Sequence, residues 1–368
     1  MFVLKVFKKH TVLCIATLAA IVTCFFVPPS AKYIEYFDFK TLSCLFLTLA
    51  VVCALRNIKF FTILARRIVM LTGNLRMLAL TLIYITFIGS MLIANDMALI
   101  TFLPLGYFAL SVTKQEKYMA YIFILQNISA NLGGMLTPFG NPQNLYLYTE
   151  FNIPTGEFTR IMLPPFLLAV AMLTVCCLIL KSEPLSISES FPEKLNMRRT
   201  VLYLVLFAMS LLIVFRAIHY LVGLIVIPAI LFFADRDSLK AVDYPLLLTF
   251  VMFFIFAGNM AKIDAVNALV SSLLEKSTFI VSTLSCQVIS NVPSAILLSQ
   301  FTDNYKELLL GVNIGGTGTL IASLASLITF SEYRLLHPGD GKKYFAMFTV
   351  INLVFLIVLG LAAFFIFI

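Results

Sequence analysis

Long apolar runs recur along the whole chain and are separated by short polar segments. Runs of about 20 residues match the bilayer thickness, and helices span lipid because they satisfy their own backbone polar groups. A β-barrel would instead show short segments of alternating polarity. The pattern therefore predicts an all-α polytopic membrane protein. Spanning helices are expected near 10–27, 41–56, 120–149, 159–181, 200–216, 218–234, 244–258, 307–330 and 344–368.

Two further apolar stretches, 78–112 and 278–302, are interpreted as re-entrant hairpins that enter and leave the membrane on one side. Each follows an amphipathic segment, at 57–77 and at 259–277. With a cytoplasmic N-terminus, 19 of the 26 Lys and Arg residues fall in cytoplasmic segments and 7 in outer segments. This positive-inside bias sets the orientation. The expected location is a cell membrane, with the C-terminus on the external face.

The first apolar run follows three lysines and resembles a signal peptide. It is long, however, and many more spans come after it, so we interpret it as a retained transmembrane helix. The predicted division is an N-terminal helix at 1–36, a first repeat at 37–181, a cytoplasmic linker at 182–199, scaffold helices at 200–241 and a second repeat at 242–368.

The two halves share three sequence blocks in the same order. In each half an Asp precedes an apolar run, and an Asn follows at the hairpin turn, at Asn95 and Asn291. The third block is the clearest, because NLGGMLT at 131–137 aligns with NIGGTGT at 313–319. By the predicted topology the hairpins dip from opposite sides, so the repeats are inverted. Inverted repeats with interrupted helices are the architecture of many secondary transporters.

Glycine pairs lie in the middle of two predicted spans, at Gly133-Gly134 and Gly315-Gly316. Each Gly costs about 1 kcal/mol relative to Ala in a helix, and Pro142 removes a further backbone donor. Irregular backbone at this depth is tolerated only where it lines a cavity or is buried in protein. We therefore expect discontinuous helices, unwound over 133–144 and over 315–323.

Unwinding exposes carbonyls that can hold a cation and frees N–H groups that attract an anion. Nearby polar side chains supply further ligands. For any single Ser or Thr, a role in helix packing or backbone hydrogen bonding is as well supported as a role in binding. The candidates are Asn95, Asn131, Thr137, Asn141, Asn144, Ser290, Asn291, Asn313, Thr317, Thr319 and Ser323.

Asp96 is the one acid that this topology places within the membrane interior. An intramembrane carboxylate is costly and is a functional candidate by default. Asp96 is expected to ligate a coupling sodium, to carry a proton, or to cap a hairpin helix, and these alternatives stay open.

Composition excludes other classes of protein. Hydrophobic residues make up 61% of the chain and charged residues 12%, far below the roughly 25% charged residues of soluble domains. The net charge of +8 lies in short loops, which argues against a nucleic-acid surface. All seven cysteines lie in apolar runs without metal-ligand spacing. No Walker motif, catalytic triad or metal cluster is present, so neither an enzyme nor a cofactor is expected.

In the hairpin turns and the duplicated glycine blocks, the chain resembles the ion transporter superfamily. This superfamily includes divalent anion:sodium symporters, citrate transporters, arsenite permeases and one type of sodium/proton antiporter. The likeness covers most of the chain. The residues that carry it are Asn95 to Leu99 with Pro104, ANLGGMLTPFGNPQNLYLY at 130–148, Ser290 to Pro293, and 313–327.

The resemblance implies an elevator, in which a transport domain of hairpins and broken helices moves against a dimeric scaffold. It also implies that substrate binds between the hairpin tips and that a cation binds at each tip. The implied substrate ligands are Asn95, Thr137, Asn141, Asn144, Ser290, Asn291, Thr319 and Ser323. Carried over by position, one cation site uses Asn95 with backbone near Gly133, and the other uses Ser290 and Asn291 with backbone near Gly315. With the residue pattern added, the candidate cation ligands are Asn95, Asp96, Asn131, Gly133, Ser290, Asn291, Asn313 and Gly315.

The tips depart from the dicarboxylate symporters, which carry Ser-Asn-Thr at both positions. Here the triplets are Ala-Asn-Asp at 94–96 and Ser-Asn-Val at 290–292, closer to the citrate and arsenite branches. The predicted function is secondary transport of a small anion, such as citrate or a dicarboxylate, coupled to sodium or protons. The alternative is an arsenite-type efflux permease or a sodium/proton antiporter.

Overall fold

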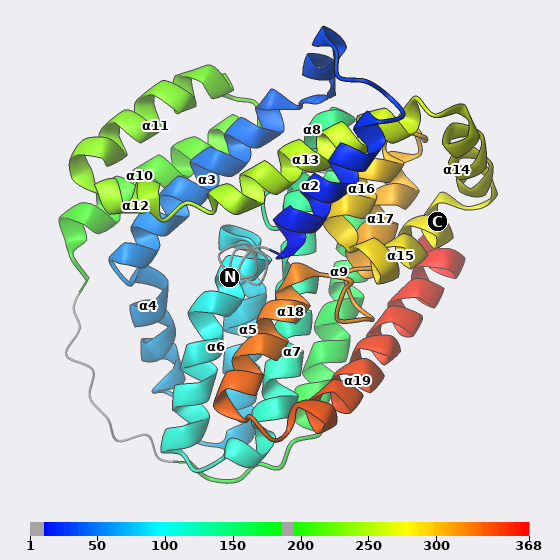
Figure 1. The fold of residues 1–368 in the computed structure, drawn as a ribbon. Helices are drawn as coiled ribbons and strands as arrows, with labels where there is room; N and C mark the ends of the chain where they lie inside the picture. Colours follow the sequence, from blue (N-terminus) through cyan, green and yellow to red (C-terminus); the bar gives the residue numbers. More distant parts are fainter. Residues whose placement is uncertain (1–10, 186–194, 368) are drawn as a thin grey trace.

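The computed structural model describes residues 11–185 and 195–367, and within them the chain is helical throughout (Figure 1). Eight helices of this described part are long and apolar enough to cross a membrane, which makes the chain a polytopic membrane protein. These helices lie in α3, α5, α6, α7, α9, α10, α13 and α19. The first ten residues of the predicted N-terminal segment and half of the predicted linker 182–199, residues 186–194, lie outside the described residues.

The first half of the chain forms eight α-helices among the described residues. They are α2 (Thr11–Cys24), α3 (Phe39–Asn57), α4 (Phe60–Val69), α5 (Leu75–Ile93), α6 (Asn95–Val112), α7 (Met119–Gly133), α8 (Pro142–Glu150) and α9 (Thr155–Leu178). Short 3-10 helices lie at Ala31–Tyr36, Glu116–Tyr118 and Gly134–Leu136.

The second half adds ten α-helices. They are α10 (Met197–Val214), α11 (Tyr220–Ala234), α12 (Arg236–Lys240), α13 (Tyr244–Ala261), α14 (Asp264–Lys276), α15 (Thr278–Ile289), α16 (Asn291–Leu298), α17 (Tyr305–Ile314), α18 (Leu324–Leu336) and α19 (Gly341–Ala362). A π-helical turn, Ala363–Phe367, follows α19.

Side chains cap corresponding helices in the two halves, α3 with α13 and α5 with α15. The carboxylates of Asp38 and Asp243 accept hydrogen bonds from backbone N–H groups at the starts of α3 and α13. Asn74 caps α5, and Ser277 caps α15 in the same way. Such caps satisfy donors that a helix start leaves unpaired. They therefore fix where the first arm of each hairpin begins.

The hairpins and interrupted helices pack in two matching sets. The helices α5, α6 and α7 contact one another pairwise, and so do α15, α16 and α17. Each set receives a helix from the other half, because α18 packs on α6 and α7 while α8 packs on α16 and α17. Helix α3 also contacts α5 and α8, but it packs mainly against α10 and α11, at the upper left of Figure 1.

The N-terminal helix α2 is tied to α13 of the second half. Nδ2 of the buried Asn259 donates to Oγ1 of Thr23 at 3.2 Å and to the hydroxyl of Tyr33 at 2.9 Å. The helices α2 and α13 contact each other extensively. Since a buried amide without partners is costly, this pairing fixes the register of α2.

Each predicted span and each hairpin arm contains a helix, with ends displaced by a few residues. The expectation for Pro142 was wrong in one respect, because this residue begins α8 rather than interrupting a helix. Proline suits the first helical position, where its missing N–H would have no partner anyway. The first interruption is thus shorter than predicted, and Asn144 lies in the first turn of α8.

Replacing Gly133 with Ala should destabilise the protein, because the new Cβ would collide with the Phe87 carbonyl and Ser90 Oγ of α5. Overpacking of this kind costs about 1–3 kcal/mol, so we expect the melting temperature to fall by roughly 2–8 °C. A thiol-reactive dye can follow unfolding, since the seven cysteines are buried or half-buried.

Gly360→Ala in α19 is the matched control, because nothing lies within 4 Å of the Cβ it would add. This variant should melt at or slightly above the wild-type temperature. Equal melting temperatures for the two variants would show that α7 and α5 do not approach as closely as described.

Candidate functional site

Both hairpin tips are held in the same unusual backbone conformation. Ala94, between α5 and α6, has φ 64° and ψ 153°, and Ser290, between α15 and α16, has φ 76° and ψ 158°. This region is essentially reserved for Gly, and a residue with a side chain pays about 1–3 kcal/mol to occupy it. Strain of this kind persists only where the surroundings over-determine it. The two tips are therefore shaped alike, although their sequences differ.

The tip asparagines use their side chains identically. Oδ1 of Asn95 accepts the N–H of Asp96 at 3.0 Å, and Oδ1 of Asn291 accepts the N–H of Val292 at 2.9 Å. Each amide thus satisfies a donor at the start of its own helix. The amide group of Asn95 still has Nδ2 available, and this atom donates to Oδ1 of Asn131 at 3.1 Å.

The second tip is tied to the second interruption through backbone. The N–H of Asn291 donates to the carbonyl of Ala322 at 2.9 Å, and the Ser290 hydroxyl approaches the same carbonyl at 3.3 Å. A Cβ on Gly316 would lie 3.0 Å from Nδ2 of Asn291, so any residue other than Gly would press against the tip side chain. Each hairpin tip thus contacts an interrupted helix of its own half.

The two interruptions have different lengths. After the 3-10 turn that follows α7, residues 137–141 are not helical, and the chain between α17 and α18 is irregular over 315–323. Thr137 lies in the first interruption, and its hydroxyl donates to the Met91 carbonyl of α5 at 2.9 Å. Both glycine pairs lie where the regular helix ends, as their low helix propensity favours.

Buried asparagines join the two interruptions to each other. Nδ2 of Asn141 donates to the carbonyl of Asn131 at 3.1 Å and lies 3.4 Å from Oδ1 of Asn313. Nδ2 of Asn313 donates to Oδ1 of Asn144 at 2.6 Å. Asn144 in turn donates to the carbonyls of the 3-10 turn, at Gly134 and Met135. We call Asn95, Asn131, Asn141, Asn144 and Asn313 the amide network, and none of them is more than 4% exposed.

A second polar contact joins α7 to α18. Nδ2 of Asn127 donates to Oγ of Ser326 at 3.2 Å, and Ser326 lies 3.0 Å from the hydroxyl of Ser323. Ser323 is the N-cap of α18 and accepts the N–H of Ser326. The candidate residue Ser323 is therefore buried and partnered within the protein.

Gln287 of α15 braces the second interruption and was missed by the sequence reasoning. Its Nε2 donates to the carbonyls of Gly315 at 2.8 Å and Thr317 at 3.1 Å, and its Oε1 accepts the N–H of Thr319. The hydroxyl of the exposed Thr319 donates to the Gln287 carbonyl, away from the amide network. The available signal was a lone amide in an apolar helix, which is a functional candidate in a membrane.

Several buried polar atoms around the amide network have no hydrogen-bond partner among the described residues. They are Oδ1 of Asp96, Nδ2 of Asn131, Oδ1 of Asn141 and Oε1 of Gln143. Buried polar atoms are nearly always paired, so each such group calls for a ligand or a functional reason. These atoms offer one amide donor and three acceptors, one of them a carboxylate.

Within residues 11–185 and 195–367, no three His, Cys, Asp or Glu side chains lie close enough to hold a metal ion together. Nor does a hydrogen bond connect the two tips directly within this described part. The structure brings Asn95, Asn131, Asn141, Asn144 and Asn313 into one network, and Ser290 and Asn291 lie against the second interruption.

Comparison with known proteins places the chain among transporters. A family model described as "Citrate transporter" matches residues 1–305. An uncharacterized transporter of Methanocaldococcus jannaschii is 32% identical over 298 residues, which cover 79% of this chain and 80% of that protein. An inner membrane protein of Escherichia coli is 30% identical over 73% of each chain. A silicon efflux transporter of Oryza sativa is 31% identical over 144 residues, 38% of this chain and 29% of that protein.

Ala94→Gly should stabilise the protein, because Gly adopts the tip conformation without a steric penalty. We expect a gain of about 1 kcal/mol in unfolding free energy, seen as a higher melting temperature. Ala98→Gly is the matched control, because Ala98 is buried in the regular part of α6. The control should lose about 1 kcal/mol, and a loss of the same size at Ala94 would refute the strained tip.

Proposed function

Because this chain belongs to the citrate transporter family, we propose that it is a secondary active transporter of a small carboxylate anion, such as citrate or a dicarboxylate, coupled to sodium or protons. Its function is transport, not catalysis. The observation that carries the proposal is the amide network, which connects one hairpin tip to both interruptions and leaves buried donors and acceptors unpaired.

The chemistry of this region suits an anion together with a cation. The starts of α6 and α16 present backbone N–H groups and a positive helix end, which favour a carboxylate. The proposed substrate ligands there are the tip residues Asn95, Ser290 and Asn291, together with Asn141, which is connected to Asn95 through Asn131. Carbonyl and amide oxygens are hard ligands that suit sodium.

We assign one cation to each tip. The first cation would contact Asn95, Asp96 and Asn131 with backbone near Gly133, and the unpartnered Oδ1 of Asp96 supports this placement. The second cation would contact Ser290, Asn291 and Asn313 with backbone near Gly315. Binding a cation beside the anion reduces the cost of bringing either charge into the membrane.

The matched packing supports two inverted repeats. Three pairwise contacts of the first set recur in the second set, and α8 and α18 are exchanged between them. In addition, the helix before α3, α2, packs on α13, and the corresponding helix before α13, α11, packs on α3. The repeats would therefore extend beyond 37–181 and 242–368 to include α2 and α11. Helix α10 would then be a single crossing between the repeats, so the second repeat would start on the opposite side of the membrane from the first. With the N-terminus in the cytoplasm, this places the C-terminus outside.

In this proposal the hairpins and interrupted helices form a transport domain that moves as an elevator against a scaffold. The scaffold would contain α3, α10, α11 and α13 and would form the homodimer in a cell membrane. The dense packing of α3 against α10 and α11 supports this division (Figure 1).

An efflux permease for a weak oxyacid is the second candidate, ahead of a sodium/proton antiporter. It is favoured by the likeness to a protein named as a silicon efflux transporter and by the tip triplet Ala94-Asn95-Asp96, which lacks a hydroxyl. A weak oxyacid would enter uncharged and hydrogen bond to amides without needing a counter-cation.

Proteoliposomes should take up labelled citrate or succinate faster with an inward sodium gradient than without one. Sodium should also raise the melting temperature of the purified protein, because a ligand of the folded state stabilises it. Uptake of arsenite or silicic acid, with no uptake of carboxylates or sulfate, would replace the leading candidate by the second. If sodium neither stabilises the protein nor drives uptake, the sodium-coupled form of the proposal fails.

Asp96→Asn should abolish coupling to the cation gradient, because it removes the carboxylate while keeping the shape of the side chain. We expect uptake to become independent of the sodium or proton gradient, with the melting temperature in cation-free buffer little changed. Asp264→Asn, at the exposed start of α14, is the matched control and should retain coupling. Unchanged coupling in Asp96→Asn would reduce Asp96 to a structural role.

A further inference from the structure

Three backbone carbonyls converge on one side-chain nitrogen beside the second interruption. Nε2 of Gln287, on α15, lies 2.8 Å from the carbonyl oxygen of Gly315 and 3.1 Å from that of Thr317. The carbonyl oxygen of Thr283, one turn earlier in α15, is 3.2 Å away. An amide nitrogen carries only two hydrogens, so carbonyl oxygens outnumber the donors at this point. Converging backbone carbonyls are the arrangement with which proteins replace the hydration shell of a cation.

The loop that supplies these carbonyls is wrapped around the Gln287 amide. Oε1 of Gln287 accepts the N–H of Thr319 at 2.9 Å, so both ends of the amide contact the same loop. Gly318 precedes Thr319 and has φ 113°, and a Cβ at this position would collide with Oε1 of Gln287. Gly adopts this conformation without a steric penalty and leaves the amide its space. The loop is therefore shaped to hold a polar group at this point.

The corresponding position of the first half holds a thioether instead of an amide. In the register of the duplicated hairpin turns, Met91 is opposite Gln287. A matching pair of hydrogen bonds supports this register. The Thr137 hydroxyl donates to the Met91 carbonyl at 2.9 Å, and the Thr319 hydroxyl donates to the Gln287 carbonyl at 3.0 Å. Because Met has no N–H or O–H donor in its side chain, it cannot hold carbonyls as Gln287 does.

Two further matched positions favour a cation more strongly in the first half. Asp96, whose Oδ1 is buried and has no hydrogen-bond partner among the described residues, corresponds to Val292. Ser90 corresponds to Cys286, and each lies against the glycine pair of its own half. Carboxylate and hydroxyl oxygens are hard ligands that suit sodium, whereas a thiol sulfur is soft and Val offers no ligand.

One exchange runs in the opposite direction. Ser290 has a hydroxyl at the second tip where Ala94 has none, but this hydroxyl approaches the Ala322 carbonyl at 3.3 Å. From the first half to the second, the main change is thus the loss of a carboxylate and the gain of an amide donor. An N–H donor repels a cation and binds the same carbonyl oxygens that a cation would bind.

We propose that the side-chain amide of Gln287 occupies the cation position of the second tip and substitutes for a cation there. Its Nε2 satisfies the carbonyls of Gly315 and Thr317, which lipid could not satisfy. A coupling cation therefore binds firmly at the first tip, beside Asp96, and enters the second tip only by displacing the amide. This inference deepens the proposed function and rests on it, because it makes the two cation sites assigned to the tips unequal.

Gln287→Glu tests the proposal, because it exchanges the N–H donor for an oxygen and keeps the length of the side chain. At alkaline pH the carboxylate would face the carbonyls without a donor, so the variant should melt below the parent in choline chloride. Sodium should bind between the carboxylate and the carbonyls and restore the melting temperature. We expect the sodium-induced rise to exceed that of the parent by roughly 5 °C, the shift for a new ligand at about 100 times its Kd in a chain of this size. The dye melting curve of the purified full chain measures this rise.

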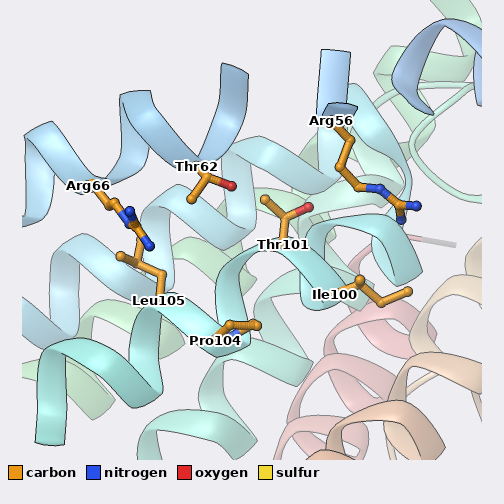
Figure 2. A pocket seen from close by; sticks show the side chains of 7 residues that line it. All are labelled: Arg56, Thr62, Arg66, Ile100, Thr101, Pro104 and Leu105. Carbon is orange, nitrogen blue, oxygen red and sulfur yellow. The ribbon is translucent and has the colours of Figure 1, made fainter. Parts of the chain in front are cut away.

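Thr62→Glu is the matched control, because Thr62 and Gln287 are both half-buried. Thr62 lines a pocket of about 190 Å³ between α4 and α6, with the side chains of Arg66 and Arg56 at its opposite ends (Figure 2). A carboxylate added there has guanidinium groups to pair with and does not require sodium. The melting temperature of this control should therefore respond to sodium as the parent does.

If Gln287→Glu does not fold, Gln287→Met takes its place, since it removes the amide without adding a charge. The carbonyls that it uncovers should likewise give a larger sodium-induced rise than the parent shows. A rise equal to that of the parent in the Gln287 variant that folds, or the same gain in Thr62→Glu, would overturn the proposal.

These measurements do not require transport, so their outcome is distinct from that of the proposed function. A parent without a sodium response, together with a gain in Gln287→Glu, would contradict the sodium-coupled function and still support the amide as the occupant of the second position. A parent that responds to sodium, together with no further gain in the Gln287 variant, would refute the inference and leave the proposed function intact.

Discussion

The need to pair every backbone polar group inside a membrane governs this structure. Two helices stop in the middle of the chain's packed region, and each stop leaves carbonyls and N–H groups that lipid cannot satisfy. Asn144 supplies donors to the 3-10 turn after α7, and Gln287 supplies donors to the carbonyls after α17. Side-chain amides thus take the role that the next helical turn would have had. Remaining atoms, such as Oδ1 of Asn141, are left for a ligand.

The two hairpin tips must also pair backbone polar groups, in this case the N–H groups at the starts of helices. The turn between the two arms of each hairpin has one residue at positive φ, and Ala94 and Ser290 occupy this position despite the strain. The adjacent asparagine caps the following helix with its own side chain. One end of the asparagine is thereby fixed and the other is free to meet the interrupted helix or a solute. A strained but well-supported tip is suited to hold a ligand without reorganisation.

Much of this arrangement could be predicted from the sequence, and the limits have physical causes. Gly133 and Gly315 mark the helix ends because glycine disfavours helix wherever it occurs. Asp38 and Asp243 predict helix starts because capping is local. By contrast, the partners of Asn141 and Asn313 depend on how two distant segments meet, and periodicity carries no information on that. Gln287 was overlooked because a single amide in an apolar run has no local signature of what it will face.

The most direct test of a solute site at the paired tips is their reactivity with a membrane-impermeant thiosulfonate. Cysteines would be placed singly at Ala94, at Ser290 and, as a control on the exposed side of a candidate spanning helix, at Val350, which is 63% exposed on α19. If the tips line a water-filled path, both tip cysteines should react above the wild-type background, the control should not, and the transported solute should slow both reactions. Tips that stay unreactive, or that react equally with and without solute, would contradict the account.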